Sequence, residues 1–159
     1  MKAIKLGIIA TFICCFLLSC ASLKAPIIKK NESLTAYRYF YLTSTNEITS
    51  GSGTIYGKYG ATTTKTLVPG DVISGYMIKN GFVRLPELKQ ELLDQTLIIN
   101  YGESGRRNLN LGYTIEVTIQ MLSAKTNAVV CVCTAEGQGS TEADDIRIAI
   151  NRALDGLFK

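Results

Sequence analysis

Polar and hydrophobic residues alternate most regularly between Tyr113 and Leu122, where the chain reads YTIEVTIQML. A period of two places the two kinds of side chain on opposite faces of a β-strand. The apolar face would hold Ile115, Val117, Ile119 and Met121. The short stretch SAKTN, residues 123–127, is typical of a turn, and AVVCVCTA, residues 128–135, then returns as an antiparallel strand. The pattern therefore predicts a β-hairpin in the C-terminal third of the chain.

After this hairpin the hydrophobic pattern changes to a helical period. Apolar residues recur at i, i+4, i+7, i+8 and i+11, at Ile146, Ile150, Ala153, Leu154 and Leu157. This spacing gathers them on one face of an α-helix. Ser140 or Thr141 can cap the helix, and acidic residues fill its first turn, where the helix dipole favours negative charge. We expect an amphipathic helix that closes the fold.

Weaker patterns predict the remaining elements. Residues 36–43 and 96–101 are expected to be strands, and residues 82–85 a short strand. A helix should open at Pro69 and close at Asn80 and Gly81, and a shorter helix should begin at Pro86 with its leucines turned inward. Residues 44–65 are rich in glycine and threonine without a sustained pattern, which favours a long loop. Together these elements predict an α+β fold, with helices packed on one face of a mixed sheet of about five strands.

The N-terminus has the layout of a secretory signal. Lys2 and Lys5 precede an apolar run, residues 6–18, which is shorter than the roughly 20 residues that span a bilayer and suits a signal h-region. The run ends in LLSC, residues 17–20, which resembles a bacterial lipobox. The resemblance implies cleavage before Cys20 and acylation of Cys20, with chains such as palmitate. Each buried CH₂ of such a chain contributes ~0.8 kcal/mol to membrane binding.

The sequence thus predicts three parts. Residues 1–19 are expected to be a cleaved lipoprotein signal peptide. Residues 20–34 would form the lipidated N-terminus and a tether of up to about 45 Å, because they show no helical or strand periodicity. Residues 35–159 would form a single domain.

Composition excludes several classes of function. The 159 residues contain no histidine, which rules out a histidine base, a Ser-His-Asp triad or a histidine metal site. Removal of residues 1–19 takes away two of the 17 basic residues and leaves 15 against 13 acidic ones, a balance that does not suggest nucleic-acid binding. We therefore expect no catalytic residues, no metal and no cofactor. An enzyme would have to rely on carboxylates alone, such as Glu103 with Glu116.

One polar cluster is the first candidate for ligand or partner contacts. The stretch GESGRR, residues 102–107, follows the predicted strand at 96–101 and brings together Glu103, Ser104, Arg106 and Arg107. A pair of arginines can clamp a carboxylate or phosphate. The same residues can equally form a solvated turn in which the arginines pair with Glu103, and this ordinary interpretation is favoured.

Other candidate sites have simpler explanations. GSGTIYGK, residues 51–58, has glycines and a lysine but lacks the spacing of a phosphate-binding loop. Cys131 and Cys133 share one face of a predicted strand with side chains that do not converge, so we expect free, buried thiols and not a disulfide. The acidic residues between Glu136 and Asp145 could suggest a cation site, but the start of a helix explains them.

The region from Thr96 to Phe158 resembles small envelope lipoproteins of Gram-negative bacteria whose function is not known. It is more distantly similar to the βαβ-type periplasmic domains of the Tol system's propeller protein, the curli-secretion lipoprotein and the lipoprotein activators of penicillin-binding proteins. The shared layout is a hairpin with a turn like SAKTN, a break of small residues and a closing amphipathic helix. Asn127 stands where such turns often hold glycine, and it tolerates the same backbone conformation.

The resemblance implies a non-catalytic adaptor that binds another envelope protein and carries over no binding residues. Acyl chains on Cys20 would hold it in the outer membrane. Ala21 resembles the default outer-membrane sorting context, and no acidic run follows Cys20, so a periplasm-facing location is favoured over the cell surface. The alternative is a binder of a small anionic or glycan ligand through Glu103–Arg107 and the glycine-threonine loop.

Overall fold

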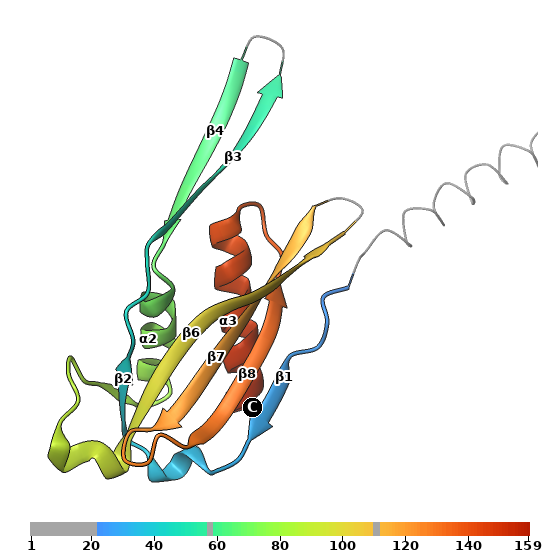
Figure 1. Cartoon of the computed structure of the whole chain (residues 1–159). Helices are drawn as coiled ribbons and strands as arrows, with labels where there is room; N and C mark the ends of the chain where they lie inside the picture. The colour runs from blue at the N-terminus through green and yellow to red at the C-terminus, as the bar shows by residue number, and fades with distance from the viewer. Residues whose placement is uncertain (1–21, 57–58, 110–111) are drawn as a thin grey trace, which may run out of the picture.

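The computed structural model describes residues 22–56, 59–109 and 112–159 (Figure 1). Six strands form one mixed sheet in the order β1-β8-β7-β6-β2-β5, and β3 and β4 form a separate two-stranded sheet. The α+β class is confirmed, with six strands in the sheet instead of about five. The predicted signal peptide, Cys20 and Ala21 lie outside the described residues, as do residues 57–58 and 110–111.

The elements have the following bounds. The strands are β1 Ile27–Lys30, β2 Tyr39–Leu42, β3 Ile48–Tyr56, β4 Tyr59–Leu67, β5 Val83–Arg84, β6 Thr96–Asn108, β7 Tyr113–Ser123 and β8 Val129–Gly137. The α-helices are α2 Pro69–Lys79 and α3 Glu142–Phe158, and two short 3-10 helices are η1 Leu34–Ala36 and η2 Gln90–Gln95. In the described part of the chain, no helix combines the length and the apolarity needed to cross a bilayer.

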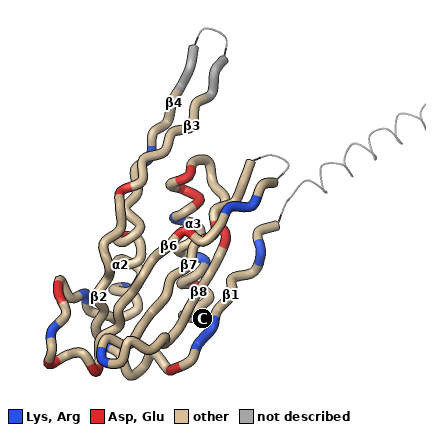
Figure 2. Tube along the Cα trace, viewed as in Figure 1, with Lys and Arg blue, Asp and Glu red and all other residues tan. Residues whose placement is uncertain are grey.

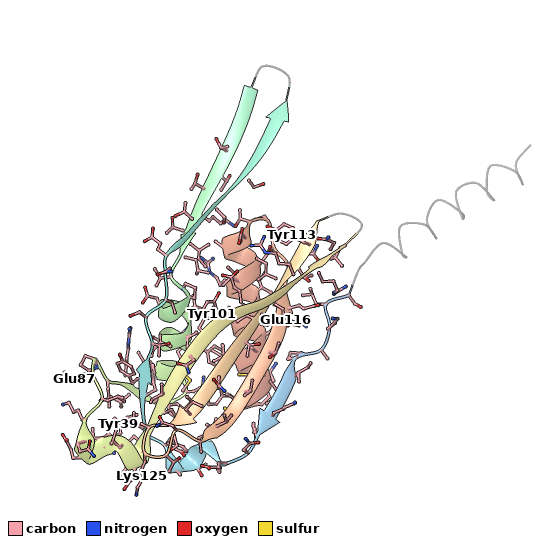
Figure 3. The ribbon with its side chains drawn as sticks, in the orientation of Figure 1. Tyr39, Glu87, Tyr101, Tyr113, Glu116 and Lys125 are labelled. Atoms are coloured by element: carbon pink, nitrogen blue, oxygen red, sulfur yellow. The ribbon has the colours of Figure 1, made fainter. Side chains whose placement is uncertain are left out.

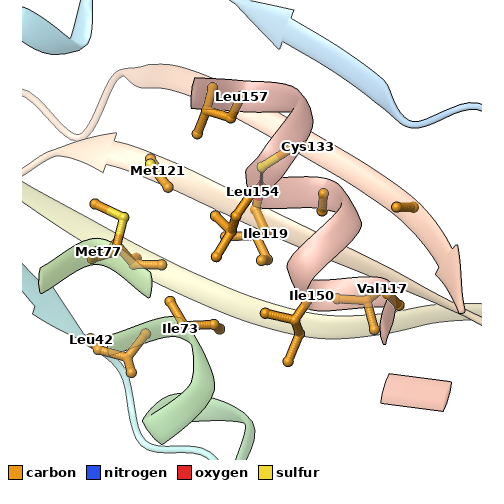
Figure 4. Close-up of a cluster of buried hydrophobic side chains, with 14 of the residues drawn as sticks. Leu42, Ile73, Met77, Val117, Ile119, Met121, Cys133, Ile150, Leu154 and Leu157 are labelled. Carbon is orange, nitrogen blue, oxygen red and sulfur yellow. Dashed lines mark hydrogen bonds between the residues drawn. The ribbon is translucent and has the colours of Figure 1, made fainter. Parts of the chain in front are cut away.

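The predicted C-terminal hairpin and helix form the centre of the core. The four apolar residues that alternate along β7 are fully buried, as are those at the centre of the helical stripe of α3. Figure 4 shows α3 lying against the strands with Ile150 and Leu154 directed into this cluster. Thr141 caps α3 by accepting a hydrogen bond from the backbone N–H of Asp144. A Cβ placed on Gly137 would lie 1.9 Å from the carbonyl oxygen of Asp145, so α3 can approach β8 this closely only because glycine is present.

Helix α2 also begins and ends where the sequence predicts. Pro69 opens it, and Gly81 follows its end with a φ of 90°, a conformation that glycine adopts at little cost. Ile73 and Met77 enter the same core as Leu42. Both helices lie on the same side of the sheet in Figure 1.

The short helix near Pro86 differs from its prediction. Residues 86–87 form a bend, and the helical turn is η2, which starts at Gln90. Leu88 is 42% exposed and is not turned inward. Proline suits the first turn of a helix, but here Pro86 lies in the bend that precedes η2.

The predicted tether is wrong over most of its length, because residues 27–34 belong to the folded domain. Strand β1 pairs antiparallel with β8, with Ile28 opposite Cys133. Upstream of β1, the backbone N–H of Lys24 donates to Glu136 at 3.1 Å. A strand of four residues is too short to show a period in the sequence, so its register with β8 is what defines it. The domain therefore begins near Lys24, and the four residues from Cys20 to Lys24 span at most about 14 Å.

Candidate functional site

The predicted polar loop at residues 102–107 is part of a strand. β6 continues to Asn108 and pairs with β7 along its whole length, with a register shift between Glu103 and Gly105. Such a bulge lets a strand change direction without losing its partner. The four candidate side chains therefore lie in the outer half of the long β6–β7 hairpin instead of in a loop.

Arg107 is bound by a buried carboxylate from a distant part of the chain. Its Nε and Nη2 atoms donate to the two carboxylate oxygens of Glu136 at 2.8 and 2.6 Å. The Glu136 side chain is only 3% exposed. The Arg107 hydrogen bond is the main cause that lowers the pKa of Glu136 to about 2, so this carboxylate is charged and paired.

The other candidate residues are also engaged within the chain. Arg106 forms an ion pair with Glu142, and its guanidinium lies 5.2 Å from the centre of the Tyr113 ring. Ser104 donates a hydrogen bond to Glu116 at 2.9 Å. Glu103 accepts a long hydrogen bond from the Tyr101 hydroxyl at 3.4 Å. Neither arginine pairs with Glu103, because Arg106 pairs with Glu142 and Arg107 with Glu136. The cluster consequently offers no unpaired arginine clamp.

The acidic residues around the start of α3 each have a partner. Asp144 pairs with Lys65 at 2.6 Å, and Asp145 accepts a hydrogen bond from the Gly139 N–H. Burial is the main cause that raises the pKa of Asp145. Across residues 22–56, 59–109 and 112–159, no three Cys, Asp or Glu side chains gather in a way that could hold a metal ion.

The segment expected to be a glycine-threonine loop is instead a two-stranded arm, which we define as residues 48–56 and 59–67. β3 and β4 pair residue for residue from Ile48 and Leu67 outward. Figure 1 shows the arm extending beyond the end of the sheet at which α3 begins. Lys65 is the only charged residue in the described part of the arm, and Figure 2 shows most of that part without charged positions.

The base of the arm is fixed to the first turn of α3. Besides its ion pair with Asp144, Lys65 donates to the Ser140 hydroxyl at 3.4 Å. The Ser50 hydroxyl accepts a hydrogen bond from the Ala143 N–H at 2.9 Å, which satisfies one of the free donors of a helix start. The Lys65 hydrogen bond is the main cause that lowers the pKa of Asp144 to about 2. These contacts set the direction in which the arm leaves the domain.

The outer part of the arm has no such support. The residues 51–53 and 62–64 are exposed, and β3 and β4 pair only with each other within the described residues. A lone two-stranded hairpin is marginally stable in water. Its free edges also lack proline and, apart from Lys65, the charges that usually protect exposed strands from further pairing. Among the described residues, the arm therefore leaves the outer edge of each of its strands unpaired.

Sequence reasoning missed the arm, although one signal was present. The run ATTTKTL, residues 61–67, is dense in threonine, which favours strands. The glycines of the facing strand and the absence of a hydrophobic period concealed it. A hairpin exposed on both faces has no reason to alternate apolar and polar residues.

The two cysteines of the domain are free and fully buried, as expected. Burial raises the pKa of Cys131 to about 11 and that of Cys133 to about 12. The Cys133 thiol donates to the carbonyl of Ile119 at 3.6 Å. Thiols with such high pKa values are poor nucleophiles, and they serve here as small core residues.

Comparison with known proteins gives little beyond a general likeness of shape. No protein-family model matches the chain, and no curated protein matches its sequence. Among solved structures, a PelC variant dodecamer from Paraburkholderia phytofirmans is 12% identical with a TM-score of 0.46, and covers 86% of this chain and 98% of its own. A second PelC dodecamer from the same organism is 12% identical with a TM-score of 0.43, and covers 83% and 96%. Likeness at this level carries no argument about function.

Proposed function

We propose that this protein is a non-catalytic, lipid-anchored adaptor of the bacterial envelope, held at the outer membrane by acyl chains on Cys20 and facing the periplasm. In this proposal the arm binds another envelope protein. The observation that carries the proposal is the arm itself, because its described part is a long two-stranded sheet with one charged residue that pairs with no other strand of the domain.

Strand addition is the binding mode that suits this geometry. An extended segment of a partner can pair with the free backbone groups of an exposed strand, and the main-chain hydrogen bonds then supply affinity. The exposed side chains of residues 62–64 are all threonine, which packs well beside a neighbouring strand. A third strand would also relieve the marginal stability of a two-stranded sheet.

The short link to Cys20 supports a role close to the membrane. Glu136 accepts from the Lys24 N–H, and Arg152 donates to the Lys24 carbonyl at 2.8 Å, so this point of the chain is fixed. In Figure 1 the chain before β1 runs toward the end of the molecule from which the arm projects. A lipid on Cys20 would therefore hold Lys24 within about 14 Å of the bilayer, on the side of the molecule toward the arm.

The anchor is tested by metabolic labelling with a fatty-acid analogue. The wild-type chain should incorporate the label and fractionate with the outer membrane, and Cys20→Ala should abolish both. Cys14→Ala is the matched control and should label normally, because residue 14 lies in the predicted signal peptide. Labelling that survives in Cys20→Ala would defeat the anchor.

The arm is tested by shortening it and measuring partner recovery from membranes after crosslinking. Residues 52–63 would be replaced by Asn-Gly, a two-residue turn that can join the paired positions Gly51 and Thr64. Because the base contacts at Ser50 and Lys65 are retained, the domain should keep its melting temperature within a few degrees. We expect at least a tenfold loss of the crosslinked partner. Unchanged recovery from the folded, shortened protein would contradict an arm-mediated contact.

The alternative, a small anionic or glycan ligand held by Glu103–Arg107, stays a prediction. The ion pairs of Arg106 with Glu142 and of Arg107 with Glu136 count against it, since a ligand would have to displace two carboxylates of the chain.

A further inference from the structure

A groove of about 690 Å³ lies at the end of the molecule opposite the arm. Its volume falls within the range of small-molecule sites, ~300–1,000 Å³. It is formed where β1 passes into η1 and where α2 and α3 both end. Its lining includes Lys30, Glu32, Leu34, Arg38, Phe82 and Phe158.

The floor of the groove is apolar and aromatic. The rings of Phe82 and Phe158 meet edge to face with their centres 5.9 Å apart. Leu34 packs partly buried against the core beside them. Tyr76 supports Phe158 from behind, again with ring centres 5.9 Å apart. Aromatic side chains fixed in this way offer a rigid apolar surface to a ligand.

The polar side of the groove is predominantly cationic. Lys30 and Arg38 contribute positive charge, against Glu32 as the one acidic side chain among the lining residues. Lys30 donates to the carbonyl of Leu157 at 2.7 Å, which offsets the negative end of the α3 dipole. Arg38 lies over the ring of Tyr39, 5.9 Å from its centre. Within the described residues neither Lys30 nor Arg38 forms an ion pair, whereas Arg106 and Arg107 both do.

We propose that this groove binds a small amphipathic anion, with an apolar or aromatic body on Phe82 and Phe158 and a carboxylate or similar head group at Arg38 and Lys30. The unpaired guanidinium and the aromatic floor each match one half of such a molecule. This choice of ligand rests on the proposed anchor at Cys20. With that anchor in place, the six residue steps from Lys24 to Lys30 would span about 20 Å between the anchored side and the groove, which favours a molecule free in solution over a lipid of the same membrane.

Naphthoate is a suitable probe because it combines an aromatic body with one carboxylate. It would be titrated by NMR into residues 20–159 carrying Cys20→Ala, which retain every described element of the domain. Saturable shifts should localise to the amides of Gly81, Phe82 and Phe158. Naphthylmethylammonium, with the same rings and the opposite charge, and acetate, with the head group alone, should each bind at least tenfold more weakly.

Arg38→Gln should raise the Kd for naphthoate about tenfold or more, the effect of losing one charge-assisted hydrogen bond. Lys29→Gln is the matched control, because Lys29 is adjacent to Lys30 in β1, is exposed and does not line the groove. Both variants change exposed side chains and should melt like the wild type. Equal affinity for the cation, or equal Kd values for Arg38→Gln and Lys29→Gln, would overturn the proposal.

Discussion

At the scale of single residues, Glu136 connects to three distant segments of the chain. Its carboxylate accepts from Arg107 of β6 and from the backbone of Lys24, while Arg152 of α3 donates to its carbonyl oxygen. Glu136→Gln would leave Arg107 with a weaker partner, and we expect the free energy of unfolding to fall by about 2 kcal/mol. Urea denaturation at neutral pH measures this loss. Glu116→Gln, which removes a less buried carboxylate, should cost less than half as much, and equal losses would contradict the role assigned to Glu136.

The same carboxylates predict how stability depends on pH. The pKa values of Glu136 and Asp144 are lowered to about 2 from ordinary values of 4.5 and 3.8. A carboxyl with a lowered pKa stabilises the folded state above its ordinary pKa, and this contribution is lost as the pH falls toward the folded value. Asp145, whose pKa is raised, has the opposite effect on stability. The two carboxyls with lowered pKa values outnumber it.

We therefore expect the free energy of unfolding to decline between about pH 4.5 and pH 2. Denaturation with urea at a series of pH values measures the slope. Glu136→Gln combined with Asp144→Asn should flatten it, while Glu116→Gln should not. A slope that the double variant leaves unchanged would show that other groups control acid stability.

Two glycines give a matched test of how closely the helices pack. Gly137 lies directly under α3, where an added Cβ would meet the Asp145 carbonyl at 1.9 Å, whereas a Cβ on Gly75 of α2 would meet nothing within 4 Å. Gly137→Ala should destabilise the fold by ~3 kcal/mol or prevent folding. Gly75→Ala should stabilise it by ~0.5–1 kcal/mol, because alanine favours a helix more than glycine does. Thermal melting of both variants measures these two changes in stability. A Gly137→Ala protein as stable as the wild type would refute the close contact between β8 and α3.

Local residue chemistry was predictable where it depends on near neighbours. The cap at Thr141, the positive φ of Gly81 and that of Asn127, at 57°, follow from a few adjacent positions. The pairing of Arg107 with Glu136 does not, because the two residues are 29 positions apart. They meet only after β6, β7 and β8 have found their register. Site residues defined by such contacts are therefore beyond a reading of sequence alone.

At the scale of elements, the sequence was informative wherever one face is buried. The burial of one face imposes a period of two on β7 and a helical period on α3, and both were predicted near their observed bounds. Residues 51–53 of β3, 62–64 of β4 and 102–106 of β6 are all exposed. Because these residues are not packed against a core, their sequences show no hydrophobic period and resemble those of loops.

The arm should open far more readily than the central sheet. Its base is fixed by Lys65 and Ser50, but residues 51–53 and 62–64 are exposed and pair only within the arm, and segments with few buried contacts unfold locally at low free energy. In hydrogen exchange of the isolated protein, amides at residues 51–53 and 62–64 should exchange at least a hundredfold faster than those of β7. Equal protection would mean that the arm is stable without a partner.

At the scale of the whole molecule, two ends have different characters. Figure 3 shows Tyr113 toward the end that carries the arm, and Lys125 at the opposite end. The arm end also holds Lys24, four residues from the predicted lipid on Cys20. The cationic groove lies at the far end. With Cys20 lipidated as proposed, the proposed protein contact would lie at the end nearer the membrane and the proposed small-molecule site at the end that faces away.

Site-specific photocrosslinking in cells is the measurement that tests the proposed adaptor role most directly. A photoreactive residue would replace exposed positions of the arm, Ser52 or Thr64, and Lys125 in the turn between β7 and β8 would serve as the control. The account predicts a discrete adduct with another envelope protein from both arm positions, lost in Cys20→Ala and absent from position 125. Adducts that form from position 125 but not from the arm would contradict it.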